Sequence, residues 1–422
     1  MPERLISFVG IFVLLGIAWL MSNNRKKIKF RTVWVGIALQ IIFALIILKT
    51  KPGLLLFDYS RIIIDKLLSF TDFGSAFLFG NLYRATPDIA REVGGGGPFQ
   101  LMDASTGHFV NVGTIFAIHV LPTIIFFASL MSILYHWGIM QKIVAAMAWV
   151  MTKAMKVSGA ESLSAASNIF VGQTEAPLVI KPYVSSMTMS ELTAIMVGGF
   201  ATVAGGIMAA YVRFGIDAGH LMAASVMSAP AALVMAKIIY PETETPETAN
   251  MVKVNVEKNT ENVIDAAAQG AAEGLRLALN VGAMLLAFIA IIAMINYGLG
   301  FLHTSLKEIF GYIFMPISFF MGVPPKDLVE FGNLLGTKVS INEFVAYVEL
   351  GAVKSQLSPR TVIIATYALC GFANFSSIAI QIGGIGGIAP NRRGDLAKLG
   401  LRAMFGGALA SWLTATIAGM II

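Results

Sequence analysis

Charged residues and cysteine are both scarce in this chain of 422 residues. Only 13% of the residues are Asp, Glu, Lys or Arg, whereas a soluble globular protein has about 25%. Hydrophobic residues make up 56% of the chain, and the mean hydropathy is +0.76. This balance excludes an ordinary soluble globular protein and indicates a polytopic membrane protein.

The single cysteine, Cys370, excludes an internal disulfide, and no Cys/His spacing resembles a metal site. The formal net charge is +6, but the basic residues cluster beside apolar stretches. In that position they act as orientation signals for membrane insertion. The positive charge therefore does not indicate nucleic-acid binding, and we expect no nucleic-acid partner.

Apolar stretches that can cross a bilayer occur eight times, since a span needs roughly 20 apolar residues. The predicted spans are Leu5–Met21, Val33–Leu48, Thr114–Tyr135, Glu191–Val212, Ala218–Ile239, Leu277–Tyr297, Thr361–Ile388 and Ala403–Ile422. Three basic clusters (25–31, 142–156 and 392–402) fall on the cytoplasmic side of this count, which places the N-terminus outside. We expect an all-α multi-pass protein with eight transmembrane helices.

Three further segments do not fit as simple spans. Leu54–Gly80 mixes apolar and charged residues, which predicts an interfacial helix lying on the membrane surface. Ile139–Met155 has the same character on the cytoplasmic side. Tyr240–Asn262 is rich in Glu, Thr, Pro and Asn, which indicates a solvated cytoplasmic linker between two halves.

Two short polar motifs interrupt the apolar sequence, Gly172-Gln173-Thr174-Glu175 and Ser340-Ile341-Asn342-Glu343. Burying an ionisable group at membrane depth costs about 2.5–3.5 kcal/mol, so such groups are usually functional. The stretches that carry the motifs, Ser158–Ser186 and Lys326–Arg360, each begin and end on one side of the membrane in the count above. Both are therefore predicted to be re-entrant hairpins, whose irregular tips must be buried in protein or line a cavity.

Each predicted hairpin is followed by two spans, and the two hairpins enter from opposite faces. This is an inverted repeat, which is typical of secondary transporters with a site near the bilayer midplane. Glycine and short polar residues interrupt one span in each repeat, at Phe200–Gly206 and at Gly371–Ser377. The predicted units are 1–157 (N-terminal scaffold spans and interfacial helices), 158–239 (first repeat), 240–262 (linker), 263–325 (scaffold helix region) and 326–422 (second repeat).

The side chains of the motifs suit a neutral, hydrogen-bonding solute. Gln173, Thr174 and Asn374 offer both donors and acceptors. No arginine is present among them to clamp a carboxylate or phosphate, so an anionic substrate is disfavoured. Asn168 and Thr202 offer side-chain oxygens that a cation favours at the end of a broken helix, although ordinary hydrogen bonds between helices explain them equally well.

The two glutamates have two interpretations. Glu175 and Glu343 either accept hydrogen bonds from a transported solute, with possible involvement in proton movement, or they neutralise Lys181 and Lys338 and serve packing alone. The functional interpretation is favoured for both, because each glutamate has amide and hydroxyl neighbours in a corresponding part of the chain.

Three motifs in register give the sequence a family resemblance. Gly172–Pro177, Asn342–Tyr347 and Cys370–Ser377 resemble the signatures of the concentrative nucleoside transporter family, of the bacterial eight-span type. The resemblance implies a homotrimer in the bacterial inner membrane, in which a transport domain moves against a scaffold in an elevator-like manner. It also implies a set of contact residues: Gly172, Gln173, Thr174, Glu175, Ile207, Glu343, Phe372, Asn374 and Ser377 for the nucleoside, and Asn168, Val171, Thr202 and Val203 for a sodium ion.

Two positions depart from the family pattern. Thr202 replaces a common serine, which keeps the oxygen and adds a methyl group. Gly206 and Ile207 stand where serine and valine are common, which leaves the preference for purine or pyrimidine nucleosides open.

The combined expectation is a sodium-coupled symporter that moves a nucleoside such as uridine, cytidine or adenosine across the lipid bilayer into the cell. Proton coupling is the first alternative. An intramembrane enzyme would need a nucleophile–base pair or a metal set, and none of the five histidines accompanies the two motifs. A channel is the remaining alternative, but a pore needs no inverted hairpins.

Overall fold

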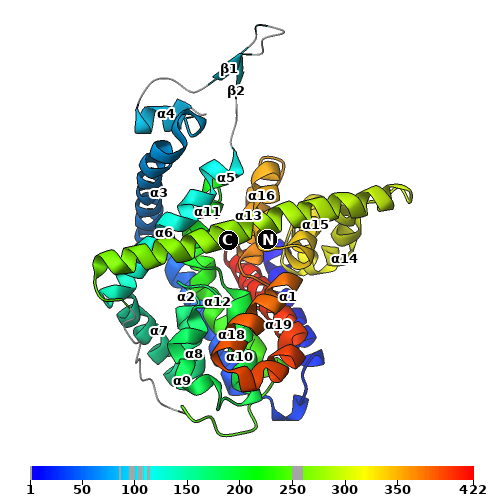
Figure 1. Ribbon diagram of the computed structural model, residues 1–422. Coiled ribbons are helices and arrows are strands. Elements are labelled where there is room, and N and C mark those ends of the chain that lie inside the picture. The colour runs from blue at the N-terminus through cyan, green and yellow to red at the C-terminus, as the bar shows by residue number, and fades with distance from the viewer. Residues whose placement is uncertain are drawn as a thin grey trace.

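The computed structural model describes residues 2–84, 87–94, 100–102, 107, 109–111, 115–249 and 260–422. Nearly all of these residues are helical (Figure 1). The exception to the predicted all-α fold is a short antiparallel pair, β1 (Gln100–Met102) and β2 (Phe109–Asn111), in which Leu101 pairs with Val110. This pair extends away from the helices at the top of Figure 1.

The helices of the first half are α1 (Pro2–Leu20), α2 (Phe30–Lys49), α3 (Lys51–Phe79), α4 (Pro87–Val93), α5 (Phe116–His119), α6 (Leu121–His136), α7 (Ile139–Met155), α8 (Gly159–Ser167), α9 (Lys181–Val184), α10 (Met189–Ala201), α11 (Gly205–Arg213) and α12 (Ala218–Ile239). Those of the second half are α13 (Val263–Gly300), α14 (Leu306–Phe320), α15 (Leu328–Ser340), α16 (Glu343–Val353), α17 (Pro359–Leu369), α18 (Phe375–Ile388) and α19 (Arg393–Ile421). Short 3-10 helices lie at Arg25–Lys27, Gly80–Leu82, Ala176–Ile180, Pro325–Asp327 and Pro390–Arg392.

Seven segments of the described chain are long and apolar enough to cross a membrane, and each overlaps one of the predicted spans. The remaining prediction, a span over Thr361–Ile388 interrupted at Gly371–Ser377, is not among these segments. Its two parts are the short helices α17 and α18, which are separated by Cys370–Asn374 at the predicted interruption. The predicted span Leu277–Tyr297 is too short, because α13 runs for 38 residues. The first residue of the predicted span Thr114–Tyr135 lies outside the described residues.

The two segments predicted to be interfacial are helical. α3 is one helix of 29 residues along one side of the molecule (Figure 1), and it is not among the segments that qualify as spans. α7 has the predicted bounds, Ile139–Met155. The placement of both helices at a membrane surface remains a prediction.

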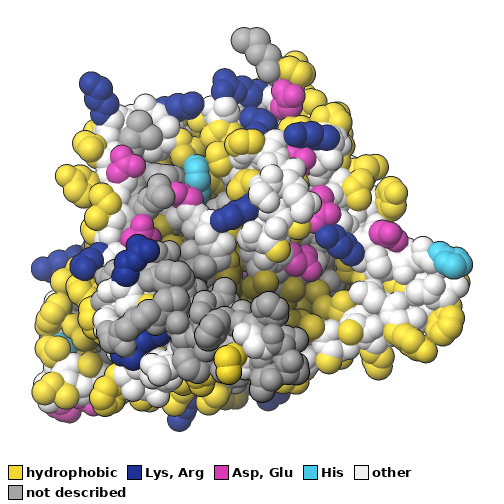
Figure 2. All heavy atoms as spheres, turned by 90° about the horizontal axis from the view of Figure 1, so that it is seen from above, with side chains coloured by type: hydrophobic (Ala, Val, Ile, Leu, Met, Phe, Trp, Pro, Cys, Tyr) yellow, Lys and Arg dark blue, Asp and Glu magenta, His cyan; other side chains and the backbone are white. Residues whose placement is uncertain are grey.

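Burial divides the long helices into two groups. The spans formed by α10 with α11, by α12 and by α19 are 94%, 89% and 89% buried, so they form the centre of the fold. In contrast, only 12% of the α13 span is buried, and this helix crosses the face of the molecule in Figure 1. Its exposed side chains include Leu279, Leu286 and Met294. From above, hydrophobic side chains are exposed around much of the outer edge (Figure 2), as expected for a surface that meets lipid or neighbouring subunits.

The first part of the predicted linker is mostly exposed, which fits a solvated segment, but a few of its residues contact the helices. Thr248 is only 5% exposed, and its carbonyl and hydroxyl oxygens accept hydrogen bonds from the N–H groups of Gly159 and Ala160. Thr188 donates to Glu242 at 2.9 Å. This part of the linker therefore satisfies orphan donors at the start of α8 and ties α8 to the start of α10. The rest of the linker, 250–259, lies outside the described residues.

Candidate substrate and ion site

The first polar motif lies where α8 has ended. A capping box between Ser158 and Glu161 starts this helix, and Asn168 is its C-cap. The motif then follows in turns before the 3-10 helix Ala176–Ile180, which has Pro177 near its start. Ser158–Ser186 therefore has helical pieces on both sides of the motif, and its re-entrant position in the membrane remains a prediction.

The second polar motif occupies the junction between α15 and α16. The oxygen of Asn342 accepts a hydrogen bond from the N–H of Val345 at 2.9 Å and so caps α16. Glu343 is the first residue of that helix, where the positive end of the helix dipole favours a carboxylate. The sequence Asn-Glu thus starts the helix and places the acid at its tip.

The two predicted helix breaks lie against each other. α10 ends at Ala201 and α11 begins at Gly205, while Cys370–Asn374 separates α17 from α18. Gly371 lies in this second break with φ +112°, and a Cβ atom there would lie 2.6 Å from the carbonyl oxygen of Phe200. Only glycine has both the conformation and the small size that this crossing requires.

Glu343 is 4% exposed, and side chains from two other helices hold it. Asn374 donates from Nδ2 to Oε2 of Glu343 at 3.0 Å, and the hydroxyl of Tyr211 donates to Oε1 at 3.2 Å. The oxygen of Asn374 accepts from the N–H of Ser377 at 2.9 Å and caps α18. The carboxylate is therefore oriented by neutral donors and keeps further lone pairs for other partners.

Gln173 connects the first hairpin to the same helix end. Its Nε2 donates to Oγ of Ser377 at 3.3 Å, and its Oε1 accepts from Nε2 of Gln381 at 3.0 Å. Gln381 in turn donates to the carbonyl oxygen of Met196 at 3.1 Å. Because Ser377 and Asn374 both lie in the first turn of α18, the two polar motifs meet there in one buried network.

The other predicted substrate residues differ in how deeply they are buried. Ile207 is 4% exposed and Phe372 is 8% exposed, whereas Gly172 and Thr174 are half-buried. Glu175 is exposed. Within the described part of the chain, its side chain has no hydrogen bond or ion pair, so its predicted contact with the nucleobase remains a prediction.

One of the predicted ion residues has an unsatisfied side-chain oxygen. Asn168 is 1% exposed and donates from Nδ2 to the carbonyl oxygen of Ser164, but its Oδ1 has no hydrogen-bond partner. Thr202 is the C-cap of α10 and its hydroxyl donates to the carbonyl oxygen of Gly198. The N–H of Gly205 donates to the carbonyl oxygen of Phe170 at 3.0 Å, which joins the hairpin tip to this break.

Val171 is half-buried beside this tip and Val203 is 1% exposed within the break, so all four predicted ion residues lie on the two segments that this bond connects. A buried oxygen without a donor, next to the carbonyl end of a broken helix, fits a small cation such as sodium.

Two network residues were not predicted from the sequence. Tyr211 lies four residues after Ile207 on α11, and Gln381 lies four residues after Ser377 on α18. Residues four apart share one face of a helix, so this spacing is the signal that could have identified both.

The structure also tests the alternative interpretation of Glu343. Lys338 is fully buried, and its Nζ donates to the carbonyl oxygens of Ala368 and Cys370 and to Oγ of Ser411. These three bonds account for the three donors of an ammonium group. Lys338 therefore forms no direct ion pair with Glu343. For Glu175 and Lys181, no ion pair is present among the described residues.

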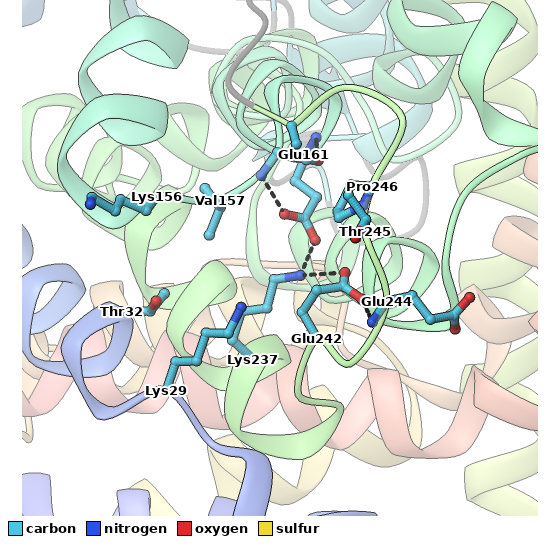
Figure 3. A pocket seen from close by; sticks show the side chains of 12 residues that line it. Lys29, Thr32, Lys156, Val157, Glu161, Lys237, Glu242, Glu244, Thr245 and Pro246 are labelled. Atoms are coloured by element: carbon cyan, nitrogen blue, oxygen red, sulfur yellow. Dashed lines mark hydrogen bonds and ion pairs between the residues drawn. The ribbon is translucent and has the colours of Figure 1, made fainter.

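A polar cavity of about 250 Å³ lies elsewhere, between the start of α2, the start of α8 and the linker (Figure 3). Inside it, the ammonium group of Lys237 lies between the carboxylates of Glu161 and Glu242 and also donates to Ser190 at 2.8 Å. The cavity contains none of the predicted substrate or ion residues. The ion pairs of Lys237 with Glu161 and Glu242 fit a structural role in joining the linker to α8, α10 and α12.

Comparison with known proteins agrees with this geometry. Residues 220–419 match the family described as "Na+ dependent nucleoside transporter C-terminus", residues 9–82 match its N-terminal counterpart, and residues 117–218 match "Nucleoside recognition". The chain is 43% identical to the uncharacterized transporter YutK of Bacillus subtilis over 98% of both chains. It is 40% identical to sodium/nucleoside cotransporter 1 of Rattus norvegicus, of which it spans 64%.

Solved structures are equally similar. CNTnw in an inward-facing, substrate-bound state has a TM-score of 0.87 and 41% identity, over 99% of this chain and 97% of that one. A doubly substituted CNTnw in an outward-facing state has a TM-score of 0.89 and 41% identity, over 99% of this chain and 98% of that one.

A helical membrane protein with two broken helices around a buried polar network is a secondary transporter by architecture. The chain belongs to the Na+-dependent, or concentrative, nucleoside transporter family. It is therefore a multi-pass membrane transporter and not an enzyme, as the sequence predicted.

Proposed function

We propose that this protein is a sodium-coupled symporter that moves nucleosides such as uridine, cytidine or adenosine into the cell. The observation that carries the proposal is the network linking Gln173, Ser377, Asn374 and Glu343. It offers amide, hydroxyl and carboxylate groups to one small volume, which matches the many donors and acceptors of a nucleoside.

The ribose is assigned to Glu343, Asn374 and Ser377. A carboxylate that is already oriented by Tyr211 and Asn374 accepts hydrogen bonds from sugar hydroxyls without rearrangement. A free base would leave the remaining lone pairs of this buried acceptor unsatisfied, which costs about 1–3 kcal/mol. A phosphorylated nucleotide would be repelled by the same carboxylate. Both effects favour nucleosides.

The base is assigned to the first hairpin and its surroundings. Gln173 presents an amide, and Thr174 and the exposed Glu175 add acceptors, while Gly172, Ile207 and Phe372 supply close apolar or backbone contact. The ion is sodium, held by Asn168, Val171, Thr202 and Val203, and the unpartnered Oδ1 of Asn168 supports this assignment. The "Na+ dependent" family description supports sodium over protons.

The transport cycle is assigned to an elevator-type motion of a transport domain. The similarity to both inward- and outward-facing CNTnw structures supports alternating access. The domain is built from the repeats 158–239 and 326–422, each with a re-entrant hairpin, and it moves against a scaffold formed by 1–157 and 263–325. The exposed apolar face of α13 supports contact with the bilayer or with the other subunits of a homotrimer in the bacterial inner membrane.

The decisive experiment is uptake of labelled uridine into proteoliposomes under an imposed sodium gradient, an imposed proton gradient or neither. We expect accumulation against a concentration gradient only with sodium. Accumulation with protons alone would favour the proton-coupled alternative. Equilibration without accumulation would favour a channel, and absence of uptake of any nucleoside would contradict the proposal.

A further inference from the structure

Lys338 is a fully buried lysine at a site where the chain has no evident need for a charge. It lies in the last turn of α15 and is 0% exposed. Its ammonium group donates to the carbonyl oxygens of Ala368 at 2.8 Å and Cys370 at 3.2 Å, and to Oγ of Ser411 at 2.7 Å. Burying an ammonium group is costly even when it is fully bonded, and an apolar side chain of similar size would avoid that cost. A role beyond packing is therefore worth examining.

Two of the lysine's three acceptors lie at the end of a half-helix. Cys370 is the C-cap of α17, and the carbonyl of Ala368 belongs to its last turn. The negative end of the helix dipole and the free carbonyls make such an end a binding place for a cation. In this protein the cation at that end is the ammonium group of Lys338, which belongs to the neighbouring helix α15.

The first repeat has an equivalent helix end. Both repeats have the same order of elements: a hairpin, a broken pair of helices and a long helix. Glu175 and Glu343 are 168 positions apart, and so are Thr202 and Cys370, which are the C-caps of α10 and α17. The carbonyl end that Lys338 contacts thus corresponds to the one beside Thr202, where the sodium ion is assigned.

The side chains at the two ends are complementary. The first end has the unpartnered Oδ1 of Asn168 and the hydroxyl of Thr202. The positions 168 residues later are Gly336 and Cys370, neither of which has a side-chain oxygen. The first repeat therefore provides oxygen ligands at this end, and the position that corresponds to Lys338 is the apolar Phe170. The second repeat provides an ammonium group, which is held by two backbone carbonyls and by the hydroxyl of Ser411.

We propose that the ammonium group of Lys338 is a fixed cation that fills, in the second repeat, the place that a mobile sodium ion fills in the first. The protein then needs one exchangeable cation per nucleoside instead of two. This inference rests on the proposed function for the identity of the mobile ion. The occupancy of the second site by Lys338 can be tested without transport.

Chemical rescue tests the site directly in the purified full-length protein. Lys338→Ala leaves a space bounded by three acceptors, so ammonium ions should raise the melting temperature of the variant much more than that of the wild type. Leu334→Ala is the matched control, because Leu334 is 1% exposed on the same helix and its removal leaves an apolar space. Choline chloride at equal concentration controls for ionic strength. An equal response of K338A and L334A to ammonium would overturn the proposal.

Transport supplies the second readout. In K338A, sodium should also enter the vacated site, so the Hill coefficient for sodium in uridine uptake should rise from near one towards two. A wild-type Hill coefficient in an active K338A would overturn the proposal. If K338A does not fold, Lys338→Met keeps the volume without charge. It should purify folded, fail to respond to ammonium and lose uptake, and full uptake by K338M would overturn the proposal.

The two proposals fail in different ways. Absence of sodium-dependent uptake in the wild type would contradict the proposed function but leave the ammonium response of K338A to be measured. Absence of that response, with normal sodium-dependent uptake in the wild type, would contradict only the fixed-cation proposal.

Discussion

The side-chain amide of Asn374 donates to Glu343 at 3.0 Å, while the oxygen of the same amide caps α18. Asn374 therefore fixes the position of a hairpin tip relative to a helix break with one side chain. The bond also orients the acid, because a group that donates to Oε2 requires an acceptor there. Tyr211 adds a second donor at Oε1.

Replacement of this acid by its amide tests that relationship. In Glu343→Gln, an NH2 group faces Asn374 or Tyr211, both of which donate in the native structure. Loss of hydrogen bonds to a charged acceptor costs about 1.5–3 kcal/mol, which corresponds to a fall of about 10- to 150-fold in nucleoside affinity. Uptake under sub-saturating uridine should then fall by a similar factor while the protein remains folded by gel filtration.

Glu349→Gln is the control, because Glu349 lies on the same helix and accepts from Thr337 instead. It should retain uptake. Wild-type uptake by Glu343→Gln would remove Glu343 from the substrate site.

The unpartnered oxygen of Asn168 leads to a prediction about sodium. Asn168→Ala removes Oδ1 from the assigned ion site, so the sodium concentration for half-maximal uptake should rise by about tenfold or more, the effect of losing one good ligand. Ser162→Ala, on the same helix and equally buried, removes another unpartnered oxygen away from the hairpin tip and should leave the sodium response unchanged. An unaltered sodium response in Asn168→Ala would place the ion elsewhere.

The sequence predicted the parts of this site that follow from local chemistry. Asn342 before Glu343 predicts the start of a helix, and the glycine in Gly371–Ser377 predicts a helix break. The structure has both features. The half-helix pair α17 and α18 was nevertheless counted as one span, because its hydropathy is continuous across the break. Hydropathy measures transfer to lipid and does not report where backbone hydrogen bonding stops.

The partners of the motif residues could not be predicted in the same way. Gln381 bonds Gln173 across 208 positions of sequence, and Tyr211 reaches Glu343 across 132. Such contacts depend on how helices pack and not on local preference. The burial of Thr248 in the linker has the same cause. Its polar side chain alone suggests a solvated residue, but in the fold Thr248 accepts hydrogen bonds from the orphan N–H groups at the start of α8.

A partly buried ion pair joins α3 to α11 and predicts an energetic coupling between its two residues. Arg213 forms an ion pair with Asp72 and donates to the carbonyl oxygen of Leu68 at 3.0 Å. Tyr83 donates to the same carboxylate. Because removing one partner leaves a charge unpaired, Asp72→Asn and Arg213→Met should each destabilise the protein by about 1–3 kcal/mol. The double variant should cost clearly less than the sum, as measured by thermal unfolding in detergent. Additive losses would mean that the pair contributes no coupling energy.

The crossing of the two helix breaks predicts a steric limit at Gly371. In Gly371→Ala the new methyl group would lie 2.6 Å from the carbonyl oxygen of Phe200, at a φ of +112°. The variant should lose about 1–3 kcal/mol or more of stability, seen as a lower melting temperature. Gly383, on α18, has no described atom within 4 Å of an added Cβ, so Gly383→Ala should behave like the wild type. Equal melting temperatures for the two variants would contradict the close crossing.

Asp327 predicts a pH dependence of stability at the base of the second hairpin. Partial burial would raise the pKa of Asp327, but hydrogen bonds from Thr361 at 2.6 Å and from the hydroxyl of Ser358 at 2.7 Å hold this pKa below its ordinary value of 3.8. A lowered pKa in the folded state stabilises the protein fully above the unfolded value, and this contribution is lost as the pH falls through that value towards the folded one. Asp327→Asn should therefore lower the melting temperature at pH 7, by an amount that shrinks below about pH 4. Asp58→Asn changes an exposed carboxyl group on α3 and serves as the control, with little effect at either pH. A difference between Asp327→Asn and the wild type that stays constant from neutral to acidic pH would show that the charge of Asp327 does not stabilise the hairpin base.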